Sequence, residues 1–174
     1  MAKYGDSEYD EFRHGVIMKD MSLPTVIFDL DGTVAEISRR RAKAMRPNGK
    51  VDWDVMYDPD NIDLDVPNQP VVAVLNMYSE KGYNVYIFSG RSDVTETATI
   101  ECLSKWDIPY AKLVMRDSSI KRLHYMKDTE LKRSWLGVHV NKEDIEVIYD
   151  DRQQVVDMWR EEGLTAFQVA KGDF

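Results

Sequence analysis

Polar and acidic side chains follow three separate apolar runs of the sequence. The runs end in Asp29-Leu-Asp31-Gly-Thr33, in Ser89-Gly90-Arg91 and in Asp150-Asp151. Carboxylates gathered at one place repel each other strongly unless a cation holds them. A set of oxygen ligands with few protein groups favours Mg²⁺. A metal ion beside a carboxylate, a hydroxyl and cationic side chains suits phosphoryl transfer, in which the carboxylate attacks phosphorus in line.

The apolar runs bring these side chains together only if they are parallel strands of one sheet. Buried strands are predicted at residues 25–30, 84–89, 111–115, 145–149 and 165–170. Helices are predicted from apolar spacing and end signals at residues 70–82, 93–106, 127–138 and 152–162. Strands that alternate with helices indicate a parallel sheet with helices on both faces. The carboxyl ends of such strands share one rim, so the polar clusters are expected to converge there.

Two segments do not fit this alternation. Residues 1–23 show no clean period and are predicted to be a lead-in, so that residues 24–174 form the domain. Residues 34–69 follow the first strand and are rich in Arg, Asp, Asn and Pro. They are predicted to be a small insertion, or cap, over the carboxyl ends of the strands, where ligands bind in such sheets.

Composition limits the class of protein. The 174 residues suffice for one compact domain. No stretch approaches the roughly 20 apolar residues that span a membrane, and no secretory signal is apparent, so a cytoplasmic location is expected (the host cytoplasm if the protein is viral). The net charge of −8 argues against sequence-independent binding to long duplex DNA, but not against contact with a short anionic end. Cys102 has no second cysteine to pair with and is predicted to be a core residue.

The motifs resemble those of the haloacid dehalogenase (HAD) superfamily of phosphatases. Phe28-Asp-Leu-Asp-Gly-Thr33 is similar to the first motif, hhhDxDGT, and Ser89 fits the second, a strand-ending Ser or Thr. Lys132 fits the third motif, a lysine on a helix, and Asp150-Asp151 fits the fourth. The resemblance runs from about Thr25 to the carboxyl end. It implies an α/β fold, an HAD-like Rossmannoid three-layer sandwich with a central parallel sheet and a small cap after the first strand.

This resemblance also implies a role for each motif residue. Asp29 would be the nucleophile that forms an aspartyl-phosphate, and Asp31 the general acid and base. Lys132 would neutralise the nucleophile and the phosphate. Mg²⁺ would be held by Asp29, the main-chain carbonyl of Asp31 and Asp150, with Asp151 orienting Lys132 or a metal-bound water. Substrate binding is assigned to Thr33, Ser89 and Gly90, with Ser89 donating a hydrogen bond to a phosphoryl oxygen.

The chain further resembles the 3′-phosphatase domain of the T4-type phage polynucleotide kinase-phosphatases. The resemblance is carried by Asp150-Asp-Arg-Gln-Gln-Val-Val-Asp-Met-Trp-Arg-Glu-Glu-Gly163, by the carboxyl-terminal Gln168–Phe174, by Ser89-Gly-Arg91 and by Lys127-Asp128. It implies that Arg40 and Arg91 contact the substrate phosphate and that Asp128 is important. Arg39 or Arg41 could replace Arg40, because three arginines stand in a row. No GxxxxGK[ST] motif is present, so no 5′-kinase activity is expected and a stand-alone phosphatase is inferred.

The expected reaction is removal of a 3′-phosphate from a DNA or RNA end or from a 3′-nucleotide. One alternative is an HAD phosphatase that acts on mononucleotides or small molecules. Another is a non-enzymatic phospho-receiver module, although there the acidic pair comes early and the lysine last, whereas here Lys132 precedes Asp150. Trp106, Trp135 and Trp159 are predicted to be core residues. For Trp53 and Tyr57, in the insertion, stacking on substrate and packing are equally open.

Overall fold

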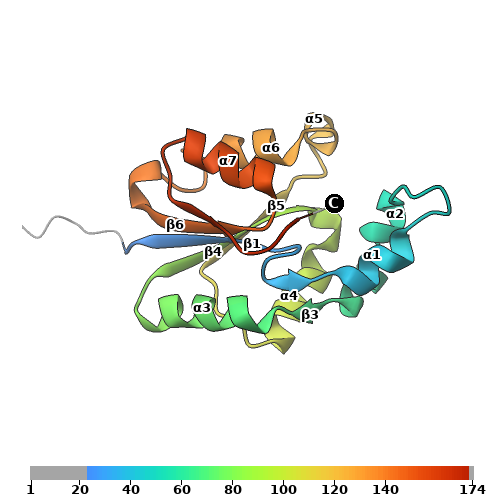
Figure 1. Cartoon of the computed structure of the whole chain (residues 1–174), viewed down its shortest axis with the longest axis horizontal. Helices are drawn as coiled ribbons and strands as arrows, with labels where there is room; N and C mark the ends of the chain where they lie inside the picture. The colour runs from blue at the N-terminus through green and yellow to red at the C-terminus, as the bar shows by residue number, and fades with distance from the viewer. Residues whose placement is uncertain (1–22, 173–174) are drawn as a thin grey trace, which may run out of the picture.

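A computed structural model describes residues 23–172 of the chain. Its centre is a five-stranded sheet in the order β5-β4-β1-β6-β7, and every neighbouring pair of strands is parallel. The strands are β1 (Thr25–Asp29), β4 (Asn84–Ser92), β5 (Lys112–Arg116), β6 (Ile145–Asp150) and β7 (Ala166–Gln168). The predicted parallel sheet is therefore confirmed, and Figure 1 shows it edge-on between two layers of helices.

Each face of the sheet is covered by its own layer of helices (Figure 1). One layer holds α3 (Gln69–Glu80) and α4 (Glu96–Lys105); the other holds α5 (Lys121–His124), α6 (Asp128–Ser134) and α7 (Gln153–Glu161). Short 3₁₀ turns occur at η2 (Asp93–Thr95) and η3 (Lys142–Asp144). This is the expected three-layer α/β sandwich. Within residues 23–172, no helix combines the length and apolar character needed to cross a membrane.

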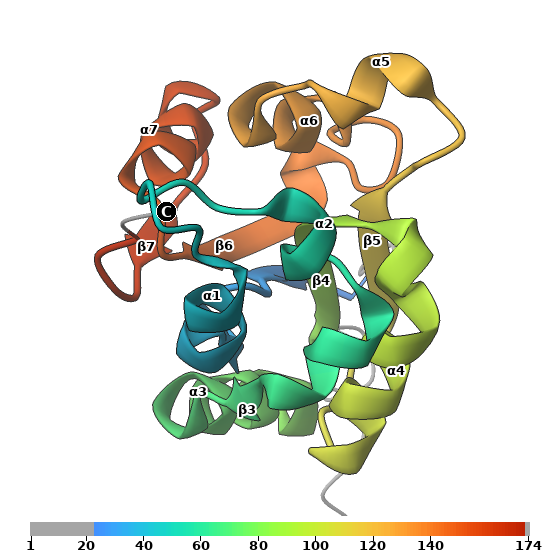
Figure 2. The same ribbon diagram turned by 90° about the vertical axis from the view of Figure 1, so that its right-hand side faces the viewer.

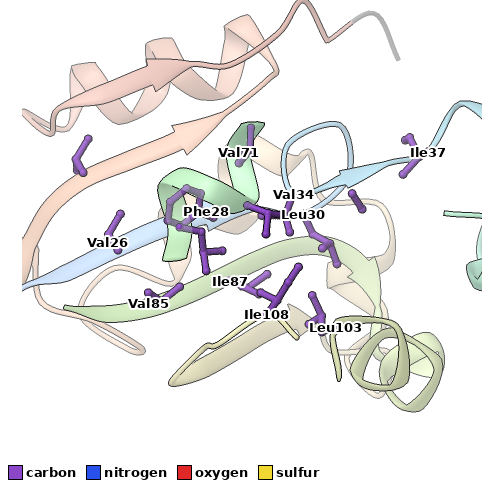
Figure 3. Close-up of a cluster of buried hydrophobic side chains, with 14 of the residues drawn as sticks. Val26, Phe28, Leu30, Val34, Ile37, Val71, Val85, Ile87, Leu103 and Ile108 are labelled. Carbon is purple, nitrogen blue, oxygen red and sulfur yellow. The ribbon is translucent and has the colours of Figure 1, made fainter. Parts of the chain in front are cut away.

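The alternation of side chains along β1 builds one core on each face of the sheet, as the two-residue period of a strand requires. Val26 and Phe28 belong to the core that packs against α3 and α4, and Figure 3 shows them beside Val85 and Ile87 of β4. Ile27 faces the opposite core, which is formed with α6 and α7. Because β1 is buried on both faces of the sheet, packing in the two cores fixes the position of Asp29 at the end of this strand.

The insertion at residues 34–69 contains short elements that the sequence does not predict. They are β2 (Ala35–Glu36), α1 (Ser38–Ala44), α2 (Trp53–Met56), η1 (Pro59–Leu64) and β3 (Val66–Pro67), with β2 and β3 paired antiparallel. Figure 2, which looks onto the carboxyl ends of the strands, shows α1 and α2 in front of this rim. The insertion therefore lies over this rim in the structure (Figure 2). The predicted lead-in lies almost wholly outside the described residues.

Candidate active site

Three aspartates from two neighbouring strands form a buried acidic group at the carboxyl rim of the sheet. Asp29 ends β1, Asp150 ends β6 and Asp151 follows it. One carboxylate oxygen of each lies within 4.8 Å of the others, and all three residues are buried. Oδ1 of Asp151 is buried with no hydrogen-bond partner among the described residues. Buried carboxylates this close require a cation, so the donor set fits a hard divalent ion such as Mg²⁺.

Lys132 joins this acidic group from α6 and supplies one positive charge. Its Nζ donates hydrogen bonds to Oδ1 of Asp29 and to Oδ2 of Asp150, both at 2.6 Å. Burial disfavours the charged ammonium, but Asp150 and Asp29 outweigh it and raise the pKa of Lys132 well above its usual value. The lysine therefore stays cationic. Its single positive charge does not balance three ionised aspartates, so the acidic group keeps a net negative charge.

The burial of the acidic group shifts the protonation of its members. Burial, opposed by Lys132 and reinforced by Asp150 and Asp151, raises the pKa of Asp29 well above its usual range. Burial and the neighbouring charge of Asp150 raise the pKa of Asp151 to about 6, against the opposing effect of Lys132. Both shifts describe carboxylates that hold protons more tightly than free ones when no cation replaces the proton.

These shifts predict how Mg²⁺ changes thermal stability with pH. A folded-state pKa of about 6 for Asp151 exceeds the unfolded value, so its stabilising contribution is present at low pH and is lost as pH rises through 6. Without metal, the melting temperature is expected to decline across this window. Mg²⁺ binds the deprotonated carboxylates, so its stabilisation should be larger at pH 7.5 than at pH 5.

Differential scanning fluorimetry with Mg²⁺ and with EDTA measures this effect. The variant Asp151→Asn should lose much of the pH dependence of the metal-free protein and much of the Mg²⁺ shift. An Mg²⁺ shift that is equal at both pH values in the unsubstituted protein would contradict the assignment of the acidic group as the metal site.

Asp31 lies outside the acidic group because two arginines hold its side chain. Its Oδ1 accepts hydrogen bonds from Nη2 of Arg40 at 2.8 Å and from Nε of Arg91 at 2.7 Å, and Nη2 of Arg91 also contacts it. Burial would raise the pKa of Asp31, but Arg91 and then Arg40 outweigh burial and lower it below its usual value. The carboxylate of Asp31 therefore pairs with the two arginines and is not part of the acidic group of Asp29, Asp150 and Asp151.

The turn that places Asp31 depends on the following glycine. Gly32 has a φ of +86°, a left-handed conformation that residues with a side chain rarely adopt. The turn is closed by hydrogen bonds from the amides of Gly32 and Thr33 to the carbonyls of Ala35 and Leu30. Asp31 therefore leaves the strand direction of β1 and faces the cap.

Asp65, which the sequence does not single out, completes the arginine cluster. It directly follows η1 in the cap, and its carboxylate accepts from Nε of Arg40 at 2.9 Å and from Nη2 of Arg91 at 2.6 Å. Arg40 also donates to the carbonyl of Met56 at 2.9 Å. Two arginines and two aspartates thus form a cluster of balanced charge that ties the cap to β4; Arg40, Arg91 and Asp65 are buried, and Asp31 is partly exposed. We call Arg40, Arg91, Asp31 and Asp65 the arginine cluster.

The structure brings Arg40 rather than its neighbours into this cluster. Arg40 is fully buried in α1, whereas Arg39 is exposed and Arg41 is half-buried. No sequence feature distinguishes Asp65 from its acidic neighbours, because the run Asp58-Pro-Asp-Asn-Ile-Asp-Leu-Asp65 offers several equivalent carboxylates. Only the folded cap shows which of them is buried.

Asp128 connects α6 to the rim through two further arginines. Its carboxylate accepts from Nη2 of Arg116 and from Nη1 of Arg152, both at 2.6 Å. Gly90 makes this position possible, because a Cβ on Gly90 would lie 2.8 Å from Oδ1 of Asp128. The glycine predicted to bind substrate therefore also allows a close approach between β4 and α6.

Ser89 and Thr33 are deeper in the protein. Ser89 is fully buried, and its Oγ accepts from the amide of Arg91 at 3.3 Å. Oγ1 of Thr33 is buried with no hydrogen-bond partner among the described residues. Ser89 lies on β4, and Thr33 lies in the turn that follows β1.

A cavity of about 710 Å³ opens onto this rim. Five of the predicted site residues line this cavity and so meet in one space: Asp29, Asp31, Gly90, Arg91 and Asp128. The remaining lining residues lie in the cap, at the ends of β4 and β5, and on or beside α5, α6 and α7: Trp53, Tyr57, Ser92, Arg116, His124, Tyr125, Met126, Lys127, Arg152 and Gln154. The volume is in the range of cavities that bind small molecules.

Comparison with known proteins shows the family. Residues 23–174 match the family described as the polynucleotide kinase PNKP phosphatase domain. The putative bifunctional polynucleotide kinase/RNA ligase of Autographa californica nuclear polyhedrosis virus is 28% identical over 164 residues, which cover 93% of this chain and 22% of that protein.

Solved structures agree. A chain of the Pnkp1/Rnl/Hen1 complex is 38% identical with a TM-score of 0.72, and the match covers 89% of this chain and 49% of that one. The haloacid dehalogenase-like hydrolase SP0104 from Streptococcus pneumoniae is 12% identical, covers 84% of both chains and has a TM-score of 0.60, which shows the fold alone. The chain spans under half of the Pnkp1-complex chain and about a fifth of the viral relative. It belongs to the family of polynucleotide kinase PNKP phosphatase domains and is an HAD-type phosphatase.

Proposed function

We propose that this phosphatase removes a 3′-phosphate from nucleic-acid ends or 3′-nucleotides, with Mg²⁺ as cofactor and Asp29 as nucleophile. The observation that carries the proposal is the buried junction of Asp29, Lys132, Asp150 and Asp151, from which Asp29 reaches the cavity that Arg91 also lines. Membership of the PNKP phosphatase family supports the 3′-phosphate as substrate.

In the first step, an oxygen of Asp29 attacks phosphorus and the bond from phosphorus to the 3′-oxygen of the substrate breaks. Asp31 donates a proton to the leaving 3′-oxygen, which departs as a hydroxyl. In the second step, water attacks the phosphorus of the aspartyl-phosphate and gives its proton to Asp31, releasing phosphate and restoring Asp29. When bound, Mg²⁺ would neutralise charge on the phosphoryl group and on the acidic group.

The arginine cluster provides a route for Asp31 to change protonation. In the structure, Arg91 and Arg40 lower its pKa and keep it ionised. We infer that the phosphate of the substrate draws Arg91, which lines the cavity, away from Asp31. The loss of that hydrogen bond would raise the pKa of Asp31 and allow it to carry the proton that the leaving group needs.

The substitution Asp31→Asn tests this acid/base role. It removes the proton carrier but keeps one side-chain oxygen that can accept from Arg40 and Arg91, which both donate to a single oxygen of Asp31, so the fold should persist. The kcat is expected to decline by at least about 10²-fold, the usual effect of losing a general acid or base. Steady-state phosphate release measures it, and a near-normal rate would assign the role to another residue.

A substrate panel tests the proposed function itself. It contains 3′-phosphorylated DNA, 3′-phosphorylated RNA, a 3′-mononucleotide and a 5′-mononucleotide, each with Mg²⁺ and with EDTA. Release of phosphate from the 3′-phosphates with Mg²⁺ only is expected. Brisk release from the 5′-mononucleotide, with none from the 3′-phosphorylated oligonucleotides, would favour the small-molecule alternative.

A further inference from the structure

Two aromatic rings of the cap stand at the wall of the catalytic cavity. Trp53 and Tyr57 lie one helical turn apart on and just after α2, with ring centroids 5.7 Å apart and an interplanar angle of 19°. Both line the cavity that contains Asp29 and Asp31. Figure 2 shows α2 in front of the carboxyl rim of the sheet.

The exposure of Trp53 distinguishes it from the core tryptophans. Trp53 is 54% exposed, whereas Trp135 and Trp159 are buried in the core beneath α6 and α7, as the sequence predicts. Tyr57, by contrast, is partly buried and packs against the core cluster of β1 and α3. The tyrosine therefore holds the pair in place, and the indole presents its apolar surface at the cavity without being needed to fill the core.

A third aromatic ring lies on another part of the cavity wall. Tyr125 follows α5, is 92% exposed and lines the same cavity. Lys127 and Arg152 line it too, so the space combines aromatic surface with positive charge. Proteins that bind single-stranded nucleic acid use this combination, because aromatic rings stack on bases of any sequence and cations attract the backbone.

We propose that Trp53, supported by Tyr57, is a stacking platform for the base of the nucleotide that carries the scissile phosphate, with Tyr125 contacting the same nucleotide. The inference rests on the proposed function, because it places the phosphate at Asp29. A phosphate held there leaves the attached nucleoside inside the 710 Å³ cavity, whose aromatic lining consists of these three residues and the imidazole of His124. The platform accepts any base, provided that the base is unpaired.

A base-and-residue cycle tests the platform. The substrates are two 3′-phosphorylated oligonucleotides that differ only in whether the terminal nucleotide carries a base or is abasic. With the intact base, Trp53→Ala is expected to raise KM by about 5- to 100-fold, the effect of losing one base–aromatic stack, with little change in kcat. With the abasic end, the same substitution should change KM little, because the partner of the indole is already absent.

Conservative and matched variants complete the design. Trp53→Phe keeps a ring and should restore most of the affinity, and Tyr125→Ala should raise KM with the intact base only. Phe167→Ala is the control, because Phe167 on β7 is 52% exposed, similar to Trp53, but does not line the cavity. Its KM should be unchanged. The melting temperature of each variant shows whether it is folded.

The outcomes separate the two proposals. If the unsubstituted enzyme does not release the 3′-phosphate, the proposed function fails and the platform with it. If it does, but Trp53→Ala raises KM equally for the intact and abasic ends, or not at all, the proposed function stands and the platform is overturned. A KM effect confined to Tyr125→Ala also overturns the assignment to Trp53.

Discussion

The variant Asp29→Asn is expected to release no measurable phosphate while remaining folded. The substitution keeps the size of the side chain but replaces the attacking carboxylate by a far less nucleophilic amide. Lys132 keeps its second partner, Asp150, at 2.6 Å. The loss of one buried charge also relieves repulsion within the acidic group, so the melting temperature of the metal-free protein should be at least that of the unsubstituted chain.

Phosphate release and thermal unfolding, measured on the same preparation, check this expectation. Asp157→Asn is the matched control, since Asp157 lies on the exposed face of α7 and pairs with Arg160 at 3.9 Å. It should leave both quantities unchanged. Retained turnover in Asp29→Asn would show that another group attacks phosphorus.

The variant Asp65→Ala is expected to lose much of its stability. It leaves Arg40 and Arg91 buried with Asp31 as their remaining carboxylate partner in the arginine cluster. Removing one partner of a buried ion pair costs about 3–5 kcal/mol, because a buried charge is left uncompensated. For a chain of this size, that cost lowers the melting temperature by roughly 6–20 °C.

The neighbouring Asp63→Ala provides the control for this substitution. Asp63 lies in η1, which Asp65 directly follows, but its side chain is 79% exposed and lies 3.8 Å from an exposed Lys105. Its removal should change the free energy of unfolding by less than about 0.5 kcal/mol. Equal melting temperatures for the two variants would contradict the view that the arginine cluster ties the cap to the sheet.

The sheet could be predicted because its strands are short, apolar and followed by polar residues. The five predicted strands all occur, although β4 continues through Ser89-Gly-Arg91 to Ser92 instead of ending at the serine. The predicted helix at residues 127–138 ends at Ser134, and α5 was not predicted. Helix ends and four-residue helices depend on local contacts more than on apolar period, so the sequence defines them poorly.

The acidic residues of the site were recognisable because each ends or directly follows a buried strand. Asp29 and Asp150 converge with Asp151 for that reason, and Lys132 reaches them from α6. The cap is different, because its elements are two to seven residues long and carry no clear period. The burial of Asp65 depends on how the cap folds over β4, and no spacing in the sequence encodes that.

Rapid acid quenching during turnover of a 3′-phosphorylated oligonucleotide with Mg²⁺, followed by peptide mass spectrometry, tests the central claim most directly. Acid quenching traps an acyl-phosphate for mapping. The expected result is a phosphoryl group on Asp29 in the unsubstituted enzyme and none in Asp29→Asn. Release of phosphate without any phosphorylated peptide, or with the phosphoryl group on another residue, would contradict the assignment of Asp29 as the nucleophile of a 3′-phosphatase.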